Sequence, residues 1–76
     1  MNKQIQECMA KAFEVPIGTI TESSSMDNIE TWDSLHHIKL IVFLEREFDV
    51  EIPDDRVGNM ISYSLIETVI NELTIS

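Results

Sequence analysis

Hydrophobic residues recur at helical spacing near the start of the chain. Five of them share one face of a helix: Ile5, Cys8, Met9, Ala12 and Phe13. The dipeptide Val15-Pro16 ends this pattern, because the residue before a proline is pushed out of the helical region. The spacing therefore predicts a first amphipathic helix with one buried side, and Cys8 is interpreted as a buried structural thiol.

The segment 34–48 contains neither proline nor glycine and is the clearest predicted helix. Asp33 precedes it and is a residue type that caps helix starts. The hydrophobic positions form a wide face: Leu35, Ile38, Ile41, Val42, Leu44 and Phe48, broadened by Leu40 and Phe43. Such a face predicts a central helix that contacts neighbours on more than one side, with Leu35 pointing into the core.

Two further helices are predicted after the central one. Asp54-Asp55 can cap a brief helix over 56–60, which an internal Gly58 weakens. The segment 64–67 has the spacing of a capping box and opens a last helix. The hydrophobic stripe of that helix is Leu65, Ile66, Val69, Ile70 and Leu73. The segment 50–52 alternates like a strand but has no partner, so we expect an extended link that ends at Pro53.

A long irregular segment, 15–33, separates the first two helices. Loops of this length are uncommon in compact domains and are often functional. Thr19 to Glu22 has capping-box spacing, which allows a short helical turn there. Five hydrophobic residues are expected to pin the loop to the core: Val15, Ile17, Ile20, Ile29 and Trp32. The sequence thus predicts an all-α fold: one domain, 1–76, forming a small four-helix bundle with three main helices, one short third helix and a long first loop.

The charge balance narrows the classes of partner. The 76 residues include 14 acidic and five basic ones, which gives a formal net charge of −9. A chain this acidic repels phosphate backbones, so nucleic acid is not an expected partner, and cationic protein surfaces are. Cys8 is the one cysteine, which fits a reducing compartment. No hydrophobic run resembles a signal peptide or is long enough to span a bilayer, so we expect a cytoplasmic protein, and a monomer.

Ser34 carries the candidate chemistry. It falls in the first turn of the central helix, directly after the long loop. The first N–H groups of a helix lack internal partners and carry partial positive charge, so a phosphate is favoured there. On the dipeptide Asp33-Ser34 alone, an ordinary helix start is the favoured interpretation.

Wider context identifies Ser34 more specifically. Asp33-Ser34-Leu35 opens the central helix, and the run from Leu44 to Asp54, LEREFDVEIPD, closes it. Together these motifs resemble the acyl carrier protein family, the phosphopantetheine-bearing carriers of fatty acid, polyketide and related pathways. The resemblance covers essentially the whole chain and includes its length, acidity and helix order.

The resemblance implies a carrier that catalyses nothing itself. A phosphopantetheinyl transferase would move 4′-phosphopantetheine from coenzyme A onto Ser34, which makes the chain a phosphoprotein. An acyl-activating enzyme would load cargo as a thioester, and an acyltransferase or condensing enzyme would take it up. The flexible arm supplies a high effective concentration of cargo. Asp33 would be recognised by the transferase, and Leu35 and Ile38 would be contact or core residues near the arm.

The exposed face of the central helix departs from the fatty-acid pattern. Carriers of fatty acid synthases usually show acidic residues there, whereas this chain has His36, His37 and Lys39. Trp32 stands where smaller residues are usual, and Thr31 replaces a common glycine. We therefore expect a specialised carrier of a secondary-metabolite or polysaccharide pathway, whose partners are recognised partly through His37 and Lys39.

The sequence raises four other interpretations. A hydrolase triad of Ser34, His37 and Asp33 is disfavoured because adjacent Asp and Ser cannot readily flank one histidine; a solvated surface role is expected for both His36 and His37. The histidine and cysteine spacing does not suit a metal site. An aminoacyl or peptidyl carrier remains an alternative. So does a helical adaptor without a prosthetic group, which would present an apolar surface formed by Trp32, Phe43 or Met60.

Overall fold

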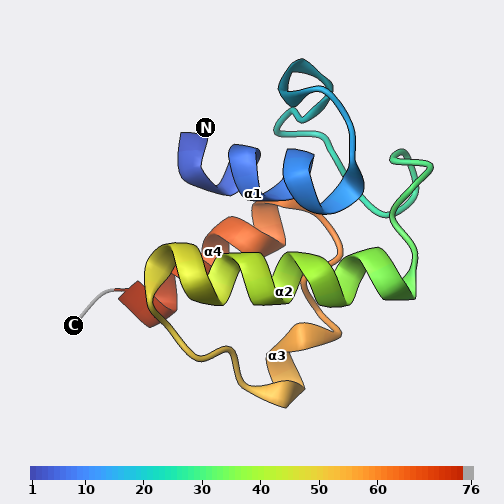
Figure 1. Ribbon diagram of the computed structural model, residues 1–76. Helices are drawn as coiled ribbons and strands as arrows, with labels where there is room; N and C mark the ends of the chain where they lie inside the picture. The colour runs from blue at the N-terminus through green and yellow to red at the C-terminus, as the bar shows by residue number, and fades with distance from the viewer. Residues whose placement is uncertain (75–76) are drawn as a thin grey trace.

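The computed structural model describes residues 1–74, which form four α-helices and one short 3₁₀ helix (Figure 1). The elements are α1 (Lys3–Phe13), η1 (Ile17–Thr19), α2 (Ser34–Phe48), α3 (Asp54–Val57) and α4 (Tyr63–Thr74). The predicted all-α bundle, with three main helices, a short third one and a long first loop, is confirmed. Within the described residues, no helix is long and apolar enough to cross a membrane.

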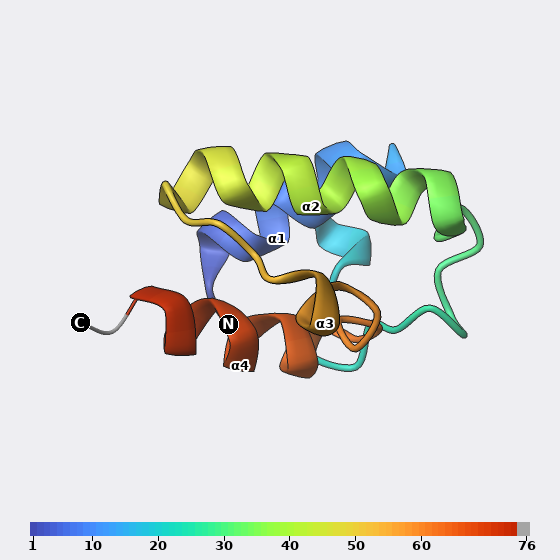
Figure 2. The same cartoon turned by 90° about the horizontal axis from the view of Figure 1, so that it is seen from below.

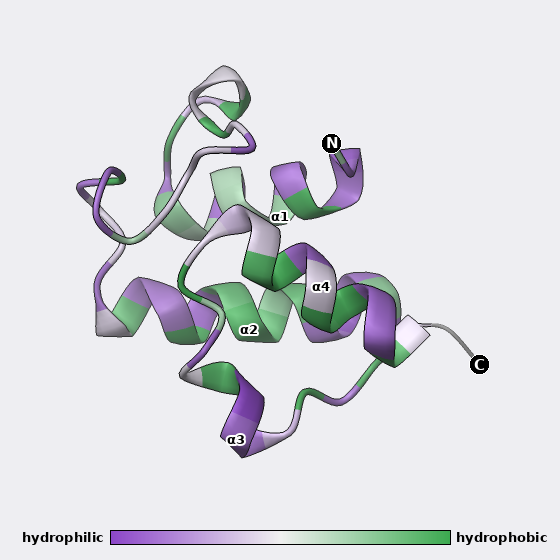
Figure 3. Ribbon diagram, turned by 180° about the vertical axis from the view of Figure 1, so that it is seen from behind, coloured by the Kyte–Doolittle hydropathy of each residue, from purple (hydrophilic) through white to green (hydrophobic). Residues whose placement is uncertain are grey.

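The three main helices enclose one core. In Figure 2, α2 and α4 run along opposite sides of the molecule, α1 lies behind them, and α3 lies in front. Hydrophobic segments line the inner sides of α2 and α4, and α3 is mainly hydrophilic (Figure 3). All five residues of the predicted first-helix stripe are buried: Ile5, Cys8, Met9, Ala12 and Phe13.

The buried face of α2 differs from the prediction at its first turn. Leu40, Ile41 and Leu44 are buried, but Leu35 is 66% exposed and Ile38 is 60% exposed. The expectation that Leu35 points into the core is therefore wrong. His37 occupies the inward position of the first turn instead, and Leu35 lies about 200° around the helix from it.

The long loop is held by four of the five predicted anchors. Ile20, Ile29 and Trp32 are buried, and Val15 packs partly buried against the core. Ile17 is 42% exposed, so the prediction for Ile17 is wrong. The helical turn lies over Ile17–Thr19, before the predicted capping box. The 3₁₀ helix does not continue beyond Thr19. The N–H of Thr21 is donated to the Ser24 hydroxyl at 2.8 Å, which places Thr21 in a tight turn instead.

Two predicted helix starts are corrected. The last helix begins at Tyr63, and the Ser62 hydroxyl, not that of Ser64, accepts a first-turn N–H, from Leu65 at 3.3 Å. The carbonyl of Ser24 accepts the Tyr63 N–H at 2.8 Å and so fixes this start. The short third helix is Asp54–Val57 rather than 56–60, because it follows Pro53 directly.

Both α1 and α2 end at a residue in the left-handed conformation. Glu14 has φ 58° and Asp49 has φ 52°, and each donates its N–H to a carbonyl of the last turn. Asp49 therefore closes α2 as predicted. The turn at Glu14 ends α1 at Phe13 and, as the site geometry shows, turns the Glu14 carboxylate toward the start of α2.

Candidate functional site

Ser34 lies at the first turn of α2 with its side chain exposed. Among residues 1–74, its hydroxyl makes no hydrogen bond, and no acceptor pairs with the backbone N–H of Ser34 or Leu35. Free N–H groups at a helix start favour a bound anion. The structure thus presents an accessible hydroxyl beside two free donors.

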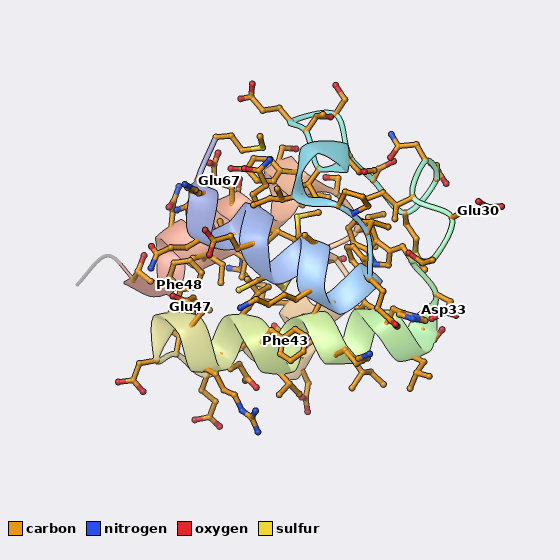
Figure 4. The ribbon with its side chains drawn as sticks, turned by 45° about the horizontal axis from the view of Figure 1, so that its top comes forward. Glu30, Asp33, Phe43, Glu47, Phe48 and Glu67 are labelled. Atoms are coloured by element: carbon orange, nitrogen blue, oxygen red, sulfur yellow. The ribbon has the colours of Figure 1, made fainter. Side chains whose placement is uncertain are left out.

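Asp33 caps this helix start. Its carboxylate accepts the His36 N–H at 2.9 Å, and the same oxygen lies 2.6 Å from Nδ1 of the His36 ring. The Asp33 carbonyl accepts the His37 N–H at 2.8 Å. The backbone hydrogen bond from His36, followed by the ring contact, lowers the pKa of Asp33. In Figure 4, Asp33 lies at the opposite end of α2 from Glu47 and Phe48.

Glu14 joins the site from the end of α1. Its carboxylate lies 3.2 Å from His36 Nε2 and 3.6 Å from Lys39 Nζ. The hydrogen bonds to Asp33 and then to Glu14 raise the pKa of His36, against partial desolvation. The hydrogen bond from His36, with the charge of Lys39, lowers the pKa of Glu14. Sequence analysis missed Glu14, since only the packing of α1 on α2 brings it near His36.

Both ring nitrogens of His37 are engaged inside the fold. Nδ1 lies 3.0 Å from Nε1 of Trp32, and Nε2 lies 2.7 Å from the carbonyl oxygen of Val57. The expectation of a solvated His37 is therefore wrong. His36, with a side chain that is 20% exposed and ion-paired, is also less solvated than expected.

The site does not have the geometry of a hydrolase triad. Asp33 contacts His36, and His37 contacts Trp32 and Val57, so among residues 1–74 no hydrogen bond joins a histidine to the Ser34 hydroxyl. Within the described part of the chain, no group of three or more His, Cys, Asp or Glu side chains is placed to hold a metal ion.

A hollow of about 290 Å³ opens beside Ser34. Its lining is mostly apolar: Met26, Ser34, His37, Ile38, Gly58 and Ile61. The long loop forms one wall because Met26 donates its N–H to the Ile61 carbonyl at 2.9 Å. The site therefore combines a free hydroxyl with an apolar recess and, on α2, the exposed side chains of Leu35 and Ile38.

The surface required for an apolar adaptor is not present where it was predicted. Trp32 is 3% exposed and Met60 is fully buried. Phe43 is partly buried against the core. Two of the three residues proposed for that surface are thus inside the bundle.

Comparison with known proteins gives two informative matches. No protein-family model matches the chain. An acyl carrier protein of Lactobacillus acidophilus is 38% identical over 66 residues, covering 79% of this chain and 82% of the relative. The fold is similar to the solution NMR structure of a holo acyl carrier protein from Geobacter metallireducens, with a TM-score of 0.80. That match has 20% sequence identity and covers 93% of this chain and 82% of the other.

Proposed function

This chain belongs to the acyl carrier protein family, and we propose that it carries acyl groups as thioesters on a 4′-phosphopantetheine arm attached to Ser34. The observation that carries the proposal is the exposed Ser34 hydroxyl at the first turn of α2, which makes no hydrogen bond to any part of residues 1–74. The Ser34 hydroxyl is not needed as a helix cap, because the Asp33 carboxylate already accepts the first-turn N–H of His36. A role in starting the helix therefore does not explain why Ser34 is a serine.

The residues around Ser34 suit a phosphodiester. The unpaired N–H groups of Ser34 and Leu35 and the positive end of the α2 dipole favour a negative charge there. The carboxylate of the preceding residue, Asp33, is engaged by the His36 N–H and ring. His36 therefore offsets the repulsion that Asp33 would otherwise exert on a phosphate.

Attachment would form one P–O bond and break another. The Ser34 oxygen would displace the 3′,5′-bisphosphate nucleotide of coenzyme A from the phosphorus of the phosphopantetheine portion, and the hydroxyl proton would be released. The bound arm supplies a terminal thiol for thioester formation. The chain's own part is to hold Ser34 outward and to present the cargo; catalysis belongs to the partner enzymes.

The partner-facing residues of the proposal surround Ser34. Leu35 and Ile38 are largely exposed, which suits an apolar contact with a phosphopantetheinyl transferase or a downstream enzyme. Asp33 offers a carboxylate beside the serine, and Lys39 offers an ammonium group on a side chain that is 42% exposed. An acyl-activating enzyme and an acyltransferase or condensing enzyme would use the same face in turn.

We further propose that the carrier works in the cytoplasm and in a specialised pathway, and the charge pattern on α2 supports the second point. The exposed side of α2 near Ser34 bears His36 and Lys39, and both contact Glu14. An enzyme whose basic surface recognises acidic residues on α2 would meet a surface of balanced positive and negative charge on this chain. This pairing favours cognate enzymes other than those of housekeeping fatty acid synthesis.

The proposal is tested by intact mass before and after incubation with coenzyme A, Mg²⁺ and a broad-specificity phosphopantetheinyl transferase. We expect the wild-type chain to gain one phosphopantetheinyl unit and Ser34→Ala to gain none. Ser64→Ala is the matched control, because Ser64 is an exposed serine in the first turn of α4. It should load like the wild type.

The opposite result has a defined meaning. A folded wild-type chain that starts unmodified and gains no mass with several transferases contradicts the carrier proposal. Equal loading of Ser34→Ala and wild type would move the attachment site to another residue. Circular dichroism of each variant would establish that the helices are intact.

A further inference from the structure

Three segments of the chain meet at the ring of His37. Trp32 belongs to the end of the long loop, His37 to the first turn of α2, and Val57 to the end of α3. The Trp32 Nε1–H points to His37 Nδ1 at 3.0 Å, and His37 Nε2 lies 2.7 Å from the Val57 carbonyl. We call these two contacts the histidine bridge.

The two hydrogen-bond partners determine which ring nitrogen of His37 carries the hydrogen. An indole nitrogen can only donate, so His37 Nδ1 must accept and carry no hydrogen. A backbone carbonyl can only accept, so Nε2 must carry the hydrogen. Only the neutral Nε2–H tautomer satisfies both contacts. A ring that is also stacked on Trp32, with centroids 6.1 Å apart, has little freedom to turn.

The bridge matters most to α3. This helix has four residues, none of them buried, and its N-cap makes no side-chain hydrogen bond. Val57 packs partly against the core, and Arg56 pairs with Glu72 of α4 at 2.8 Å. Within residues 1–74, the His37–Val57 contact is the one hydrogen bond between α2 and α3. So short an element depends on such contacts for its position.

The bridge also borders the hollow beside Ser34. His37 and Ile38 line it from α2, and Gly58, the neighbour of Val57, lines it from the end of α3. Trp32 is anchored in turn by stacking on Phe13, with centroids 4.4 Å apart. A movement of Val57 away from His37 would therefore displace the wall that contains Gly58.

We propose that His37 is a positioning residue: through the histidine bridge it holds α3 and the end of the long loop against α2, so that the hollow beside Ser34 keeps its shape for partner enzymes. The effect on partner enzymes rests on the proposed function, whereas the bridge itself does not. The two parts therefore have separate tests.

The first test uses the wild-type protein. Long-range ¹H–¹⁵N NMR of the imidazole ring at neutral pH distinguishes the two neutral tautomers and the cation. We expect the Nε2–H tautomer for His37, with a slowly exchanging Trp32 indole proton. An Nδ1–H tautomer, or an indole proton that exchanges like a free one, would overturn the bridge.

Two variants then separate its two contacts. In His37→Asn the amide oxygen can replace Nδ1 and keep the Trp32 contact, but the side chain is too short to reach Val57. In His37→Gln the amide nitrogen can replace Nε2 and keep the Val57 contact. Amide exchange should therefore speed up about fivefold at Val57, Asn59 and Met60 in the Asn variant, as expected for one lost hydrogen bond. The Gln variant should stay near wild type at these amides.

The matched control is His36→Gln, which changes the neighbouring histidine and leaves the bridge intact. A third variant, His37→Leu, removes both contacts because leucine has no hydrogen-bonding group. Equal exchange in α3 for wild type, His37→Asn and His37→Leu would overturn the proposal. If a His37 variant does not fold, the tautomer measured in the wild type still decides whether the bridge exists.

The functional part is read from the kinetics of phosphopantetheine transfer. We expect His37→Asn to raise the KM for the carrier about fivefold and to leave kcat unchanged, with KM recovered in His37→Gln. An unchanged KM together with faster amide exchange in α3 would show that the bridge does not affect recognition by the transferase. That result would overturn the functional part of the proposal. A wild-type chain that does not load at all contradicts the proposed function instead, and leaves the NMR outcomes valid.

Discussion

The two adjacent histidines at the start of α2 have opposite environments. His36 lies between the carboxylates of Asp33 and Glu14, which favour its protonated form. His37 lies between a donor, the Trp32 indole, and an acceptor, the Val57 carbonyl, which together select a neutral ring. His36 thus balances charge next to Ser34, whereas His37 connects α2 to the long loop and to α3.

The environment of His36 predicts a pH-dependent contribution to stability. Its pKa is raised in the folded chain, chiefly by the Asp33 hydrogen bond. The contribution is therefore fully present below the unfolded pKa of about 6.5 and is lost as the pH rises through the folded pKa. We expect wild type to exceed His36→Gln in free energy of unfolding at about pH 5.5, and the difference to shrink toward about pH 9.

Urea denaturation of both proteins at several pH values measures this difference. His37→Gln serves as a comparison, since among residues 1–74 the His37 ring contacts no carboxylate. A wild-type advantage that is constant or grows with rising pH would contradict the assignment of His36.

Cys8 is predicted to be unreactive in the folded chain. Burial raises the pKa of its thiol from 9.0 to about 11, with the Glu47 charge adding to the effect. The thiolate fraction near neutral pH falls about a hundredfold, and access is restricted as well. A thiol reagent should therefore react with no group in the native apo chain and with one in the urea-unfolded chain. Native apo protein that reacts as fast as free cysteine would contradict this.

At the level of elements, the sequence predicts α2 well because several local signals agree there. Asp33 is a cap, residues 34–48 lack helix breakers, and Asp49 ends the run, so the predicted bounds are those observed. The starts of α3 and α4 were misplaced. Those starts depend on Pro53 and on the contact of Ser24 with Tyr63, which joins segments far apart in the sequence.

Asp33 has two roles at the start of α2 that substitution can separate. Asparagine caps a helix about as well as aspartate, whereas alanine costs roughly 0.5–2 kcal/mol. We expect Asp33→Asn to unfold near the wild-type urea concentration and Asp33→Ala to unfold earlier. Both should load more slowly with the transferase if the carboxylate is recognised.

Denaturation and loading are measured on the same samples. Asp33→Asn with wild-type loading would contradict recognition of the charge, and Asp33→Ala with wild-type stability would contradict the cap. His36→Gln controls for the loss of the ion pair that both substitutions remove.

At the level of the whole molecule, the charge is unevenly placed. The chain has a net charge of −9, but α2 contains two acidic residues, Glu45 and Glu47, and two basic ones, Lys39 and Arg46. The near-neutral helix could be read from the sequence. That Glu14, the residue directly after α1, completes the charge balance beside Ser34 could not be read from it, because the contact forms only when α1 packs on α2.

This distribution predicts how enzyme selectivity can be changed. Replacing His36 and Lys39 by glutamate should increase turnover by fatty-acid-synthase enzymes that recognise acidic carriers. The new carboxylates would face Glu14, so the substitutions are made together with Glu14→Gln to remove that repulsion. A malonyl-transfer assay on the loaded carriers measures the effect.

The control for this experiment is the neutral set Glu14→Gln, His36→Gln and Lys39→Gln. It changes the same positions without adding negative charge. No gain for the glutamate set over the neutral set would contradict the argument that charge on α2 selects the partner.

For the core and the site, too, the sequence does not show which distant segments come into contact. Periodicity predicted the buried stripe of α1, and hydrophobicity alone predicted Ile20, Ile29 and Trp32 as loop anchors. It placed Leu35 inside, since hydrophobicity alone does not distinguish a core residue from an exposed contact residue. It placed His37 outside, because the partners that accommodate a polar ring come from the loop and α3.

Attachment at Ser34 is tested by fragmenting the loaded chain in a mass spectrometer. We expect the added phosphopantetheinyl group on Ser34 in every loaded molecule. The group on another serine, such as one of the loop serines at 23–25, would contradict Ser34 as the attachment site.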